Sequence, residues 1–299
     1  MSLRREQLAD ATPGKISSTA TTNQLPSLPG WIEGGRVSIG PVPAQLDDAT
    51  HRGVLWEARP GRLLLSVPGV ARYLASDGRA LTIAPELGAD AREIDRFALS
   101  TPLAALCLQR GLPALHAATV VGPAGAVVLC GDSAAGKSTL AAALMLRGWS
   151  VLADDLTPIG IGAEGACVAQ PTASHLTLWP DALDALRIDP PDRGQTGPTR
   201  WSPRHLSGCA APIVAVWILR LETAAELRAQ EVRGAEKLLA LSEAAYNSKI
   251  TTALLPPQTH LQIAGALART ARIWRVSRPL SGWHVEALVR LVLADAPGV

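Results

Sequence analysis

The chain has 299 residues, of which 47% are apolar and 18% charged, a composition typical of a globular protein with one large or two modest domains. The formal net charge of +2 argues against nucleic acid as a partner. No run of about 18 apolar residues predicts a membrane span, and the N-terminus lacks the apolar core of a signal peptide. A cytoplasmic protein without membrane or nucleic-acid partners is therefore expected.

The N-terminal third divides into an arm and a small domain. Residues 1–29 are rich in Ser, Thr, Ala and Pro without periodicity, which predicts a flexible N-terminal arm. Short alternating runs broken by Gly, Pro and Asp-Gly follow, and they indicate strands and hairpins. Residues 90–111 have apolar residues at helical spacing, with Pro102 as a breaking or restarting point. We predict a small β-rich N-terminal domain with a linking helix over residues 30–111.

From residue 112 onwards strands and helices alternate, which predicts an α/β catalytic domain over residues 112–299 with a helical C-terminal part. The expected strands are ALHAATVV, GAVVLCG, WSVLADDLTPIGIG, residues 166–180, APIVAVWILRL and RIWRVS. The expected helices are 138–147, 180–186, 234–247, 258–271 and 282–295. The polar segment 190–207 is interpreted as a loop.

A phosphate-binding motif follows the strand GAVVLCG. GDSAAGKS matches GxxxxGK[ST] without exception, and a strand before it and a helix after it are the context that this motif requires. Backbone N–H groups and the helix N-terminus would surround the phosphates, Lys137 would reach the β- and γ-phosphates, and the Ser138 hydroxyl would ligate Mg²⁺. ATP and Mg²⁺ are the predicted cofactors. The predicted nucleotide-binding residues are Gly131, Asp132, Ser133, Ala134, Ala135, Gly136, Lys137, Ser138 and Thr139.

Three further side chains are candidates for the same site. Asp154 and Asp155 follow the strand SVLA, and carboxylates at a strand end beside a phosphate loop can hold Mg²⁺ or accept a proton. Solvated surface acids are the alternative. His116 lies at the start of the strand before the loop strand, and a purely structural histidine is the alternative there.

The polar segment 190–207 carries a cluster of basic residues. Arg200 and Arg204, together with Arg193 and His205, could clamp a γ-phosphate or a peptide carboxylate. A solvated surface loop is the alternative. Neither Lys237 nor Lys249 has a predicted role.

These residues resemble the catalytic domain of bacterial HPr kinase/phosphorylase. His116 precedes Gly131 by the same interval as in that family, and GDSxxGKS, the Arg147-Gly148 pair and the LADD strand end also match. The family departs from this chain at Ala134, where it usually has Gly, and at Thr139, where it usually has Glu. Its ExRG signature is not found after the Asp pair, so phosphorylase activity is not expected.

The resemblance implies transfer of a phosphoryl group to a serine hydroxyl on a protein or peptide. It implies that Asp154 is the general base, that Asp155 assists through Mg²⁺ or by orienting Asp154, and that His116 tunes the charge of the pair. Lys137 keeps its phosphate role and Ser138 its metal role. Which of the two aspartates is the base stays open. A homo-oligomer is compatible with the resemblance.

The order of motifs along the chain is similar to that of divergent HPr-kinase-like proteins. It consists of a β-rich front, a QRGLPALHA entry, the phosphate loop, LADD and LWPDAL. Among these proteins are the lasso-peptide kinases, which phosphorylate a serine of a ribosomal precursor peptide, typically at its C-terminus. The resemblance favours this kind of acceptor over an HPr-like carrier protein. A small-molecule kinase and a non-catalytic nucleotide-sensing regulator are the alternatives from other classes.

Overall fold

The structure is a computed structural model, and it describes residues 26–191, 197–223 and 226–295. Most of the arm predicted over residues 1–29 lies outside the described residues, and so does Arg193. Within the described ranges the chain forms several β-sheets with helices packed around them, so the predicted α/β class is confirmed. No helix in these ranges is long and apolar enough to cross a membrane.

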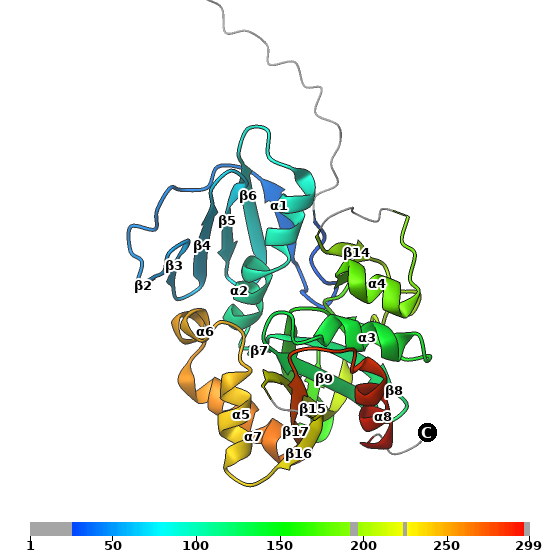
Figure 1. The fold of residues 1–299 in the computed structure, drawn as a ribbon. Helices are drawn as coiled ribbons and strands as arrows, with labels where there is room; N and C mark the ends of the chain where they lie inside the picture. Colours follow the sequence, from blue (N-terminus) through cyan, green and yellow to red (C-terminus); the bar gives the residue numbers. More distant parts are fainter. Residues whose placement is uncertain (1–25, 192–196, 224–225, 296–299) are drawn as a thin grey trace, which may run out of the picture.

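The first sheet has six strands in the order β1-β6-β5-β4-β3-β2 and lies at the top of Figure 1. The strands are β1 (Arg36–Ile39), β2 (His51–Arg52), β3 (Trp56–Arg59), β4 (Arg62–Val67), β5 (Ala71–Ser76) and β6 (Ala80–Pro85). Helices α1 (Ala91–Ala98) and α2 (Thr101–Gln109) share a hydrophobic cluster with this sheet. Pro102 lies in the first turn of α2, where its missing N–H leaves no helical hydrogen bond unmade. The predicted strands and the break in the helix are therefore confirmed.

The second sheet has nine strands and contains the phosphate-binding motif. Its central order is β10-β8-β9-β15-β17-β16, and β12, β11 and β7 continue from the N-terminal end of β15. The strands are β7 (Ala114–Leu115), β8 (Ala117–Gly122), β9 (Gly125–Gly131), β10 (Ser150–Ala153), β11 (Thr157–Ile161), β12 (Cys167–Ala169), β15 (Ala211–Glu222), β16 (Arg228–Val232) and β17 (Arg272–Pro279). Since β9, β15 and β17 run parallel, their carboxyl ends meet at one edge of the sheet.

Helices cover both faces of this sheet (Figure 1). One face packs against α3 (Lys137–Met145), α4 (Pro180–Leu186) and α8 (Val285–Asp295). The other face packs against α5 (Glu236–Glu243) and α7 (Pro257–Thr270). The residues of β9 divide accordingly: Val127 and Leu129 join the α3 cluster, whereas Val128 and Cys130 join the α5 cluster. Burial on both faces explains why the sequence of this strand is continuously apolar.

Three elements were not expected from the sequence. The segment interpreted as a loop contains β14 (Thr199–Trp201), which forms a two-stranded antiparallel sheet with β13 (Leu176–Leu178). Strand β16 pairs with β17 at the edge of the large sheet, and α6 (Ser248–Leu254) follows α5 as a separate helix. Each of these elements is short and depends on a partner distant in sequence, which periodicity does not reveal.

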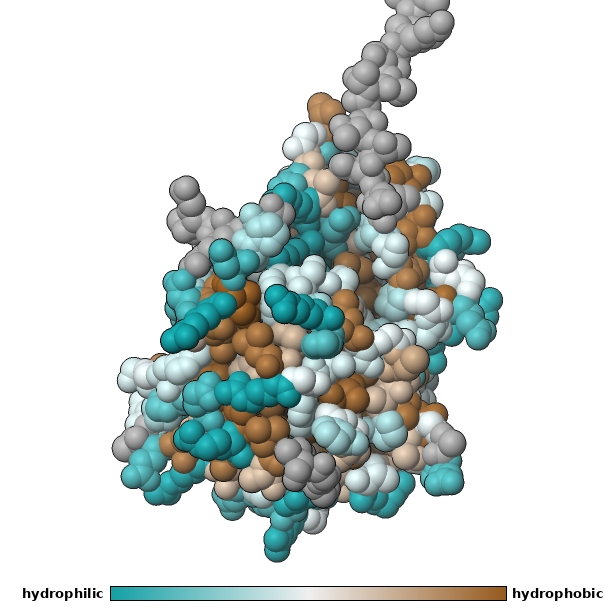
Figure 2. All heavy atoms as spheres, turned by 90° about the vertical axis from the view of Figure 1, so that its right-hand side faces the viewer, coloured by the Kyte–Doolittle hydropathy of each residue, from teal (hydrophilic) through white to brown (hydrophobic). Residues whose placement is uncertain are grey.

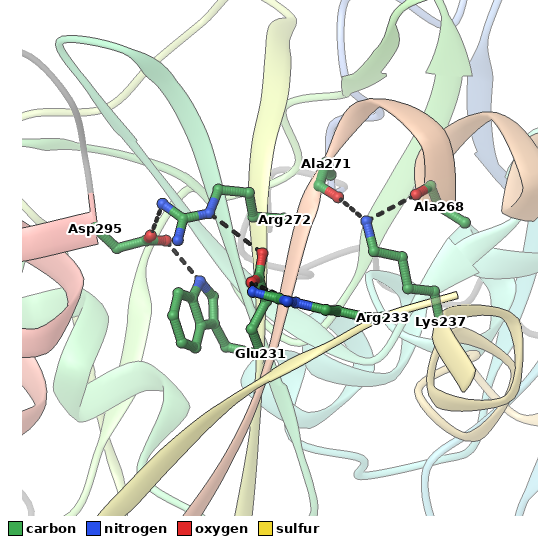
Figure 3. Close-up of polar contacts among 8 residues, drawn as sticks. Glu231, Arg233, Lys237, Ala268, Ala271, Arg272 and Asp295 are labelled. Atoms are coloured by element: carbon green, nitrogen blue, oxygen red, sulfur yellow. Dashed lines mark hydrogen bonds and ion pairs between the residues drawn. The ribbon is translucent and has the colours of Figure 1, made fainter. Parts of the chain in front are cut away.

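A polar network joins the C-terminal helix α8 to strands β16 and β17 of the large sheet (Figure 3). Arg272 on β17 forms an ion pair with Asp295 at the end of α8, and the indole of Trp274 donates a 2.7 Å hydrogen bond to the same carboxylate. Glu231 on β16 pairs with Arg233 at 2.8 Å and with Arg272 at 3.7 Å. The network therefore fixes α8, one of the helices beside the phosphate-binding motif.

Candidate active site

The phosphate-binding loop begins where β9 ends at the sheet edge. Gly131 has φ 142°, and a Cβ there would lie 2.4 Å from the Leu219 carbonyl oxygen on β15, so only glycine fits. Gly136 has φ 96° and immediately precedes α3. The predicted strand, loop and helix are therefore present, and α3 begins at Lys137, one residue before the predicted start.

Lys137 is almost completely buried beneath the loop. Its ammonium group donates to the carbonyl oxygens of Gly131 at 2.8 Å and Asp132 at 3.1 Å, and it lies 3.2 Å from Nε2 of His116. Burial lowers the pKa of this lysine, and the nearby Asp155 and Asp154 oppose that shift. The amine is thus held by backbone oxygens at the place where the motif requires a cation.

His116 joins the lysine to the aspartate pair. Its Nδ1 lies 3.0 Å from the carbonyl oxygen of Asp155 and its Nε2 faces Lys137. Because a carbonyl only accepts and an ammonium only donates, these contacts indicate a neutral ring protonated at Nδ1. Burial and the charge of Lys137 both lower the pKa of His116, in agreement with that state.

The Asp154 carboxylate lies against the first turn of α3. Its Oδ1 accepts a 2.8 Å hydrogen bond from the Ser138 hydroxyl, and its Oδ2 accepts a 2.9 Å bond from the Thr177 backbone N–H on β13. Burial, together with the adjacent Asp155, raises the pKa of Asp154, while the two hydrogen bonds act in the opposite direction. Both oxygens are therefore already positioned by protein groups.

Asp155 is exposed and adopts a left-handed backbone conformation with φ 64°. Aspartate tolerates this region better than most residues, although it costs some strain, and such positions gather at functional sites. The kink separates β10 from β11 and directs the Asp155 carbonyl to His116. The residue also lines the cavity that holds the loop.

The cavity beside the loop has a volume of about 740 Å³. Its polar end is formed by residues 133–139 of the loop together with His116, Asp155 and Thr177. Gly131 and Asp132 instead line a neighbouring cavity of about 720 Å³, which His116 also borders. The structure thus brings the predicted residues 133–139 and His116 to one cavity with Asp155, and Asp154 lies just behind it.

The predicted arginine clamp does not line either cavity. Arg200 is exposed on β14, in register with Thr177, and Arg204 is exposed in the segment that follows. The charge of Arg200 reaches His175 instead: burial first and then this arginine lower the pKa of the histidine to about 4, and Asp155 opposes that shift. His175 is half-buried and was not identified from the sequence.

Arg278 is a loop contact that sequence reasoning missed. Its Nε donates to the Ala135 carbonyl at 3.1 Å and its Nη2 to the Ala134 carbonyl at 3.3 Å. Leu219 of β15 pairs with Gly131 on one side and with Val276 on the other, so Arg278 lies just beyond the level of the loop. A basic residue at the carboxyl end of a parallel strand is the signal that could have identified it.

The oxygen donors at the start of α3 fit Mg²⁺. The Ser138 hydroxyl and the Asp154 carboxylate already converge at 2.8 Å, and Mg²⁺ is usually held by one or two carboxylates together with substrate phosphates. Over the ranges that the structure describes, no group of three or more His, Cys, Asp and Glu side chains could hold a metal by itself. A metal shared with phosphates is therefore the type of site that these residues suit.

Comparison with known proteins gives structural similarity without a sequence match. No family model and no curated protein match the chain. Among solved structures it is similar to the Hpr(Ser) kinase/phosphatase from Coxiella burnetii, with a TM-score of 0.31 and 11% identity over 61% of this chain and 88% of that chain. A match this distant does not assign a function to the chain.

Proposed function

We propose that this protein is an Mg²⁺- and ATP-dependent kinase that phosphorylates a serine hydroxyl of a peptide or protein. The observation that carries the proposal is the contact of Ser138 with Asp154 at a cavity lined by the phosphate-binding loop, His116 and Asp155. A nucleotide-binding loop alone fits many activities. A metal-binding pair, an exposed carboxylate and a buried lysine at one cavity are the parts that phosphoryl transfer to a hydroxyl needs.

The residues divide into those that hold the nucleotide and those that hold the metal. Loop N–H groups and the α3 N-terminus would bind the phosphates, and Lys137 would turn from its backbone carbonyls to a phosphate oxygen. Ser138 and Asp154 would hold Mg²⁺, which supplies charge neutralisation at the phosphates. Neutral His116 keeps the lysine and the Asp155 backbone in place through its two ring nitrogens.

Asp155 is the better candidate for the base. Both oxygens of Asp154 accept hydrogen bonds from Ser138 and Thr177, whereas Asp155 lines the cavity that a hydroxyl can enter. In this assignment the serine hydroxyl gives its proton to Asp155 as its oxygen attacks the γ-phosphorus, and ADP leaves. The sequence left open which of the two aspartates is the base, and this assignment favours Asp155.

The acceptor is proposed from the sequence resemblance. We propose a lasso-type precursor peptide, with a serine near its C-terminus, ahead of an HPr-like carrier protein. The preference for the precursor peptide over the carrier protein is supported by the order of motifs along the chain: the β-rich front, the loop, LADD and LWPDAL.

The decisive assay measures phosphate transfer from Mg-ATP to a panel of peptides that carry internal or C-terminal serines, with mass spectrometry as the readout. An HPr-like protein and a metabolite panel serve as competing acceptors. Asp155→Asn is expected to reduce transfer by about 100-fold or more and to leave Mg-ATP affinity intact, because it removes only the proton acceptor. Asp154→Asn is expected to weaken the Mg²⁺ dependence of nucleotide binding.

Different results would contradict different parts of the proposal. If Asp155→Asn keeps full activity while Asp154→Asn binds Mg-ATP normally and transfers nothing, the two roles are reversed. Phosphorylation of metabolites alone would exclude the peptide acceptor. Tight Mg-ATP binding without transfer to any acceptor would favour a nucleotide-sensing regulator.

A further inference from the structure

The cavity beside the phosphate-binding loop has an apolar end that the proposed chemistry does not use. At this end the cavity is lined by Leu280 and Trp283 from the β17–α8 connection and by Val285 and Leu288 from α8, whereas Trp179, just before α4, lines it beside Thr177. Trp283 is 44% exposed and Trp179 is 56% exposed, although large aromatic side chains are usually covered in a folded protein. On the face that carries α3, α4 and α8, apolar side chains reach the surface between hydrophilic ones (Figure 2).

We propose that Trp283 is the platform on which the base of the bound nucleotide stacks. The inference rests on the proposed function only in requiring that a nucleoside triphosphate occupies the loop. The volume of about 740 Å³ lies within the roughly 300–1,000 Å³ of small-molecule sites, so one cavity can hold both phosphates and nucleoside. An exposed indole face at the rim of a phosphate site suits a purine ring.

The positions of the catalytic groups determine which end holds the base. Asp154 is hydrogen-bonded to Thr177 on β13, and β13 leads directly to Trp179. The γ-phosphate must face the aspartates, so the acceptor approaches from the Trp179 side. The nucleoside, at the other end of the triphosphate, therefore points towards Trp283.

The backbone of the β17–α8 connection supports this orientation. Arg278 binds the Ala134 and Ala135 carbonyls. In the order β10-β8-β9-β15-β17, Arg278 on β17 and Asp154 after β10 lie on opposite sides of the loop strand β9. Gly282 has φ 93°, and a Cβ there would lie 3.0 Å from Nε2 of His284. That ring nitrogen lies 2.9 Å from the Ser281 carbonyl oxygen, so a closed turn positions Trp283. The platform is thus formed before any ligand binds.

The experiment distinguishes the contribution of the base to binding from that of the phosphates, and it compares two ligands of the full-length chain. Calorimetry measures the affinities of Mg-ATP and of Mg²⁺ with inorganic tripolyphosphate. Trp283→Ala is expected to weaken Mg-ATP binding by about 10- to 100-fold, the range for loss of one stacked base, and to leave tripolyphosphate affinity unchanged. Trp283→Phe, which keeps an aromatic face, is expected to retain most of the affinity. Trp179→Ala is the matched control, since it removes the exposed indole at the other end.

Each contrary result identifies what is wrong. Equal Mg-ATP affinity in Trp283→Ala and the parent chain would overturn the platform, and so would an equal loss for both ligands or an equal loss in Trp283→Phe. A loss in Trp179→Ala but not in Trp283→Ala would reverse the orientation and overturn the inference. A parent chain that binds neither ligand would overturn the proposed function as well. Mg-ATP binding without phosphoryl transfer would contradict the kinase activity alone.

Discussion

Ala134 occupies a backbone conformation that favours glycine. It lies in the phosphate-binding loop with φ 65°, and it is also the position where the resembling family usually has Gly. An L-residue with a Cβ is destabilised in this region by about 1–2 kcal/mol relative to its preferred conformation. The carbonyl of Ala134 accepts a hydrogen bond from Arg278, which helps to hold the strained turn.

Replacing Ala134 by Gly should therefore stabilise the chain. We expect a gain of up to about 1 kcal/mol in the free energy of unfolding, because relief of strain exceeds the added freedom of the unfolded chain. Urea denaturation measures the change. Ala135→Gly is the matched control: Ala135 is 1% exposed and packs in the α3 cluster, so the same substitution should destabilise by about 1 kcal/mol. Equal destabilisation by both changes would show that Ala134 is not strained.

Among single residues, the sequence predicted those site residues whose positions follow from the spacing of known motifs. Lys137, Ser138 and Asp154 converge because the motif fixes the loop and the next strand returns beside it. Arg278 was missed although it lies at the carboxyl end of a parallel strand, and His175 was missed because it precedes β13, which pairs with residues distant in sequence. Arg200 and Arg204 were chosen for their charge, and charge does not determine to which face a strand directs its side chains.

Among the elements, α7 ends against a lysine from α5. The ammonium group of Lys237 donates to the carbonyl oxygens of Ala268 and Ala271, each at 2.9 Å, and points at the last turn of the helix (Figure 3). Carbonyls at a helix C-terminus have no partner within the helix, and a cation also interacts favourably with the helix dipole there. Lys237, which had no predicted role, therefore joins two helices on one face of the large sheet.

Removing this cap should weaken the packing of α5 on α7. Lys237→Met keeps most of the aliphatic chain and loses both hydrogen bonds, so the free energy of unfolding is expected to fall by about 1–3 kcal/mol. Thermal or urea unfolding provides the measurement. Lys249→Met on α6 is the control, because Lys249 is exposed and its loss should change stability by less than about 0.5 kcal/mol. If the two substitutions have the same effect, Lys237 does not act as a cap.

Helices and strands could be predicted where the sequence pattern that defines them lies within a few neighbouring residues. The long buried strand β15 and helices α3, α4 and α7 follow from apolar runs, a phosphate motif or flanking Pro and Gly. The pairing of β13 with β14 was missed because Thr199–Trp201 is a three-residue strand within a polar segment. Its stability comes from pairing with residues more than 20 positions earlier, which local propensity does not encode.

At the scale of the whole molecule, helix α6 and the segment before it connect the two sheets. Helix α6 follows α5 in the C-terminal part of the chain, but Ile250 and Leu254 belong to the hydrophobic cluster of the six-stranded sheet. The segment before α6 pairs with the large sheet instead, where the Tyr246 N–H donates to the Ala114 carbonyl. Tyr246 also places its hydroxyl 3.2 Å from Thr101 on α2 and its ring edge-on to His116. The domain boundary between residues 111 and 112 stays a prediction, and α6 and Tyr246 form contacts across it.

This connection should make the two sheets unfold together. Leu254 is 8% exposed, and Leu254→Ala is expected to cost about 2–5 kcal/mol through loss of apolar contact and the cavity left behind. Because α6 contacts one sheet and its N-terminal connection pairs with the other, hydrogen exchange should increase in β5 and in β9 to similar extents. Leu261→Ala on α7 is the control, since that side chain is 63% exposed. If only β5 loses protection in Leu254→Ala while β9 keeps it, the sheets are independent folding units, and the active site does not depend on the N-terminal domain for its stability.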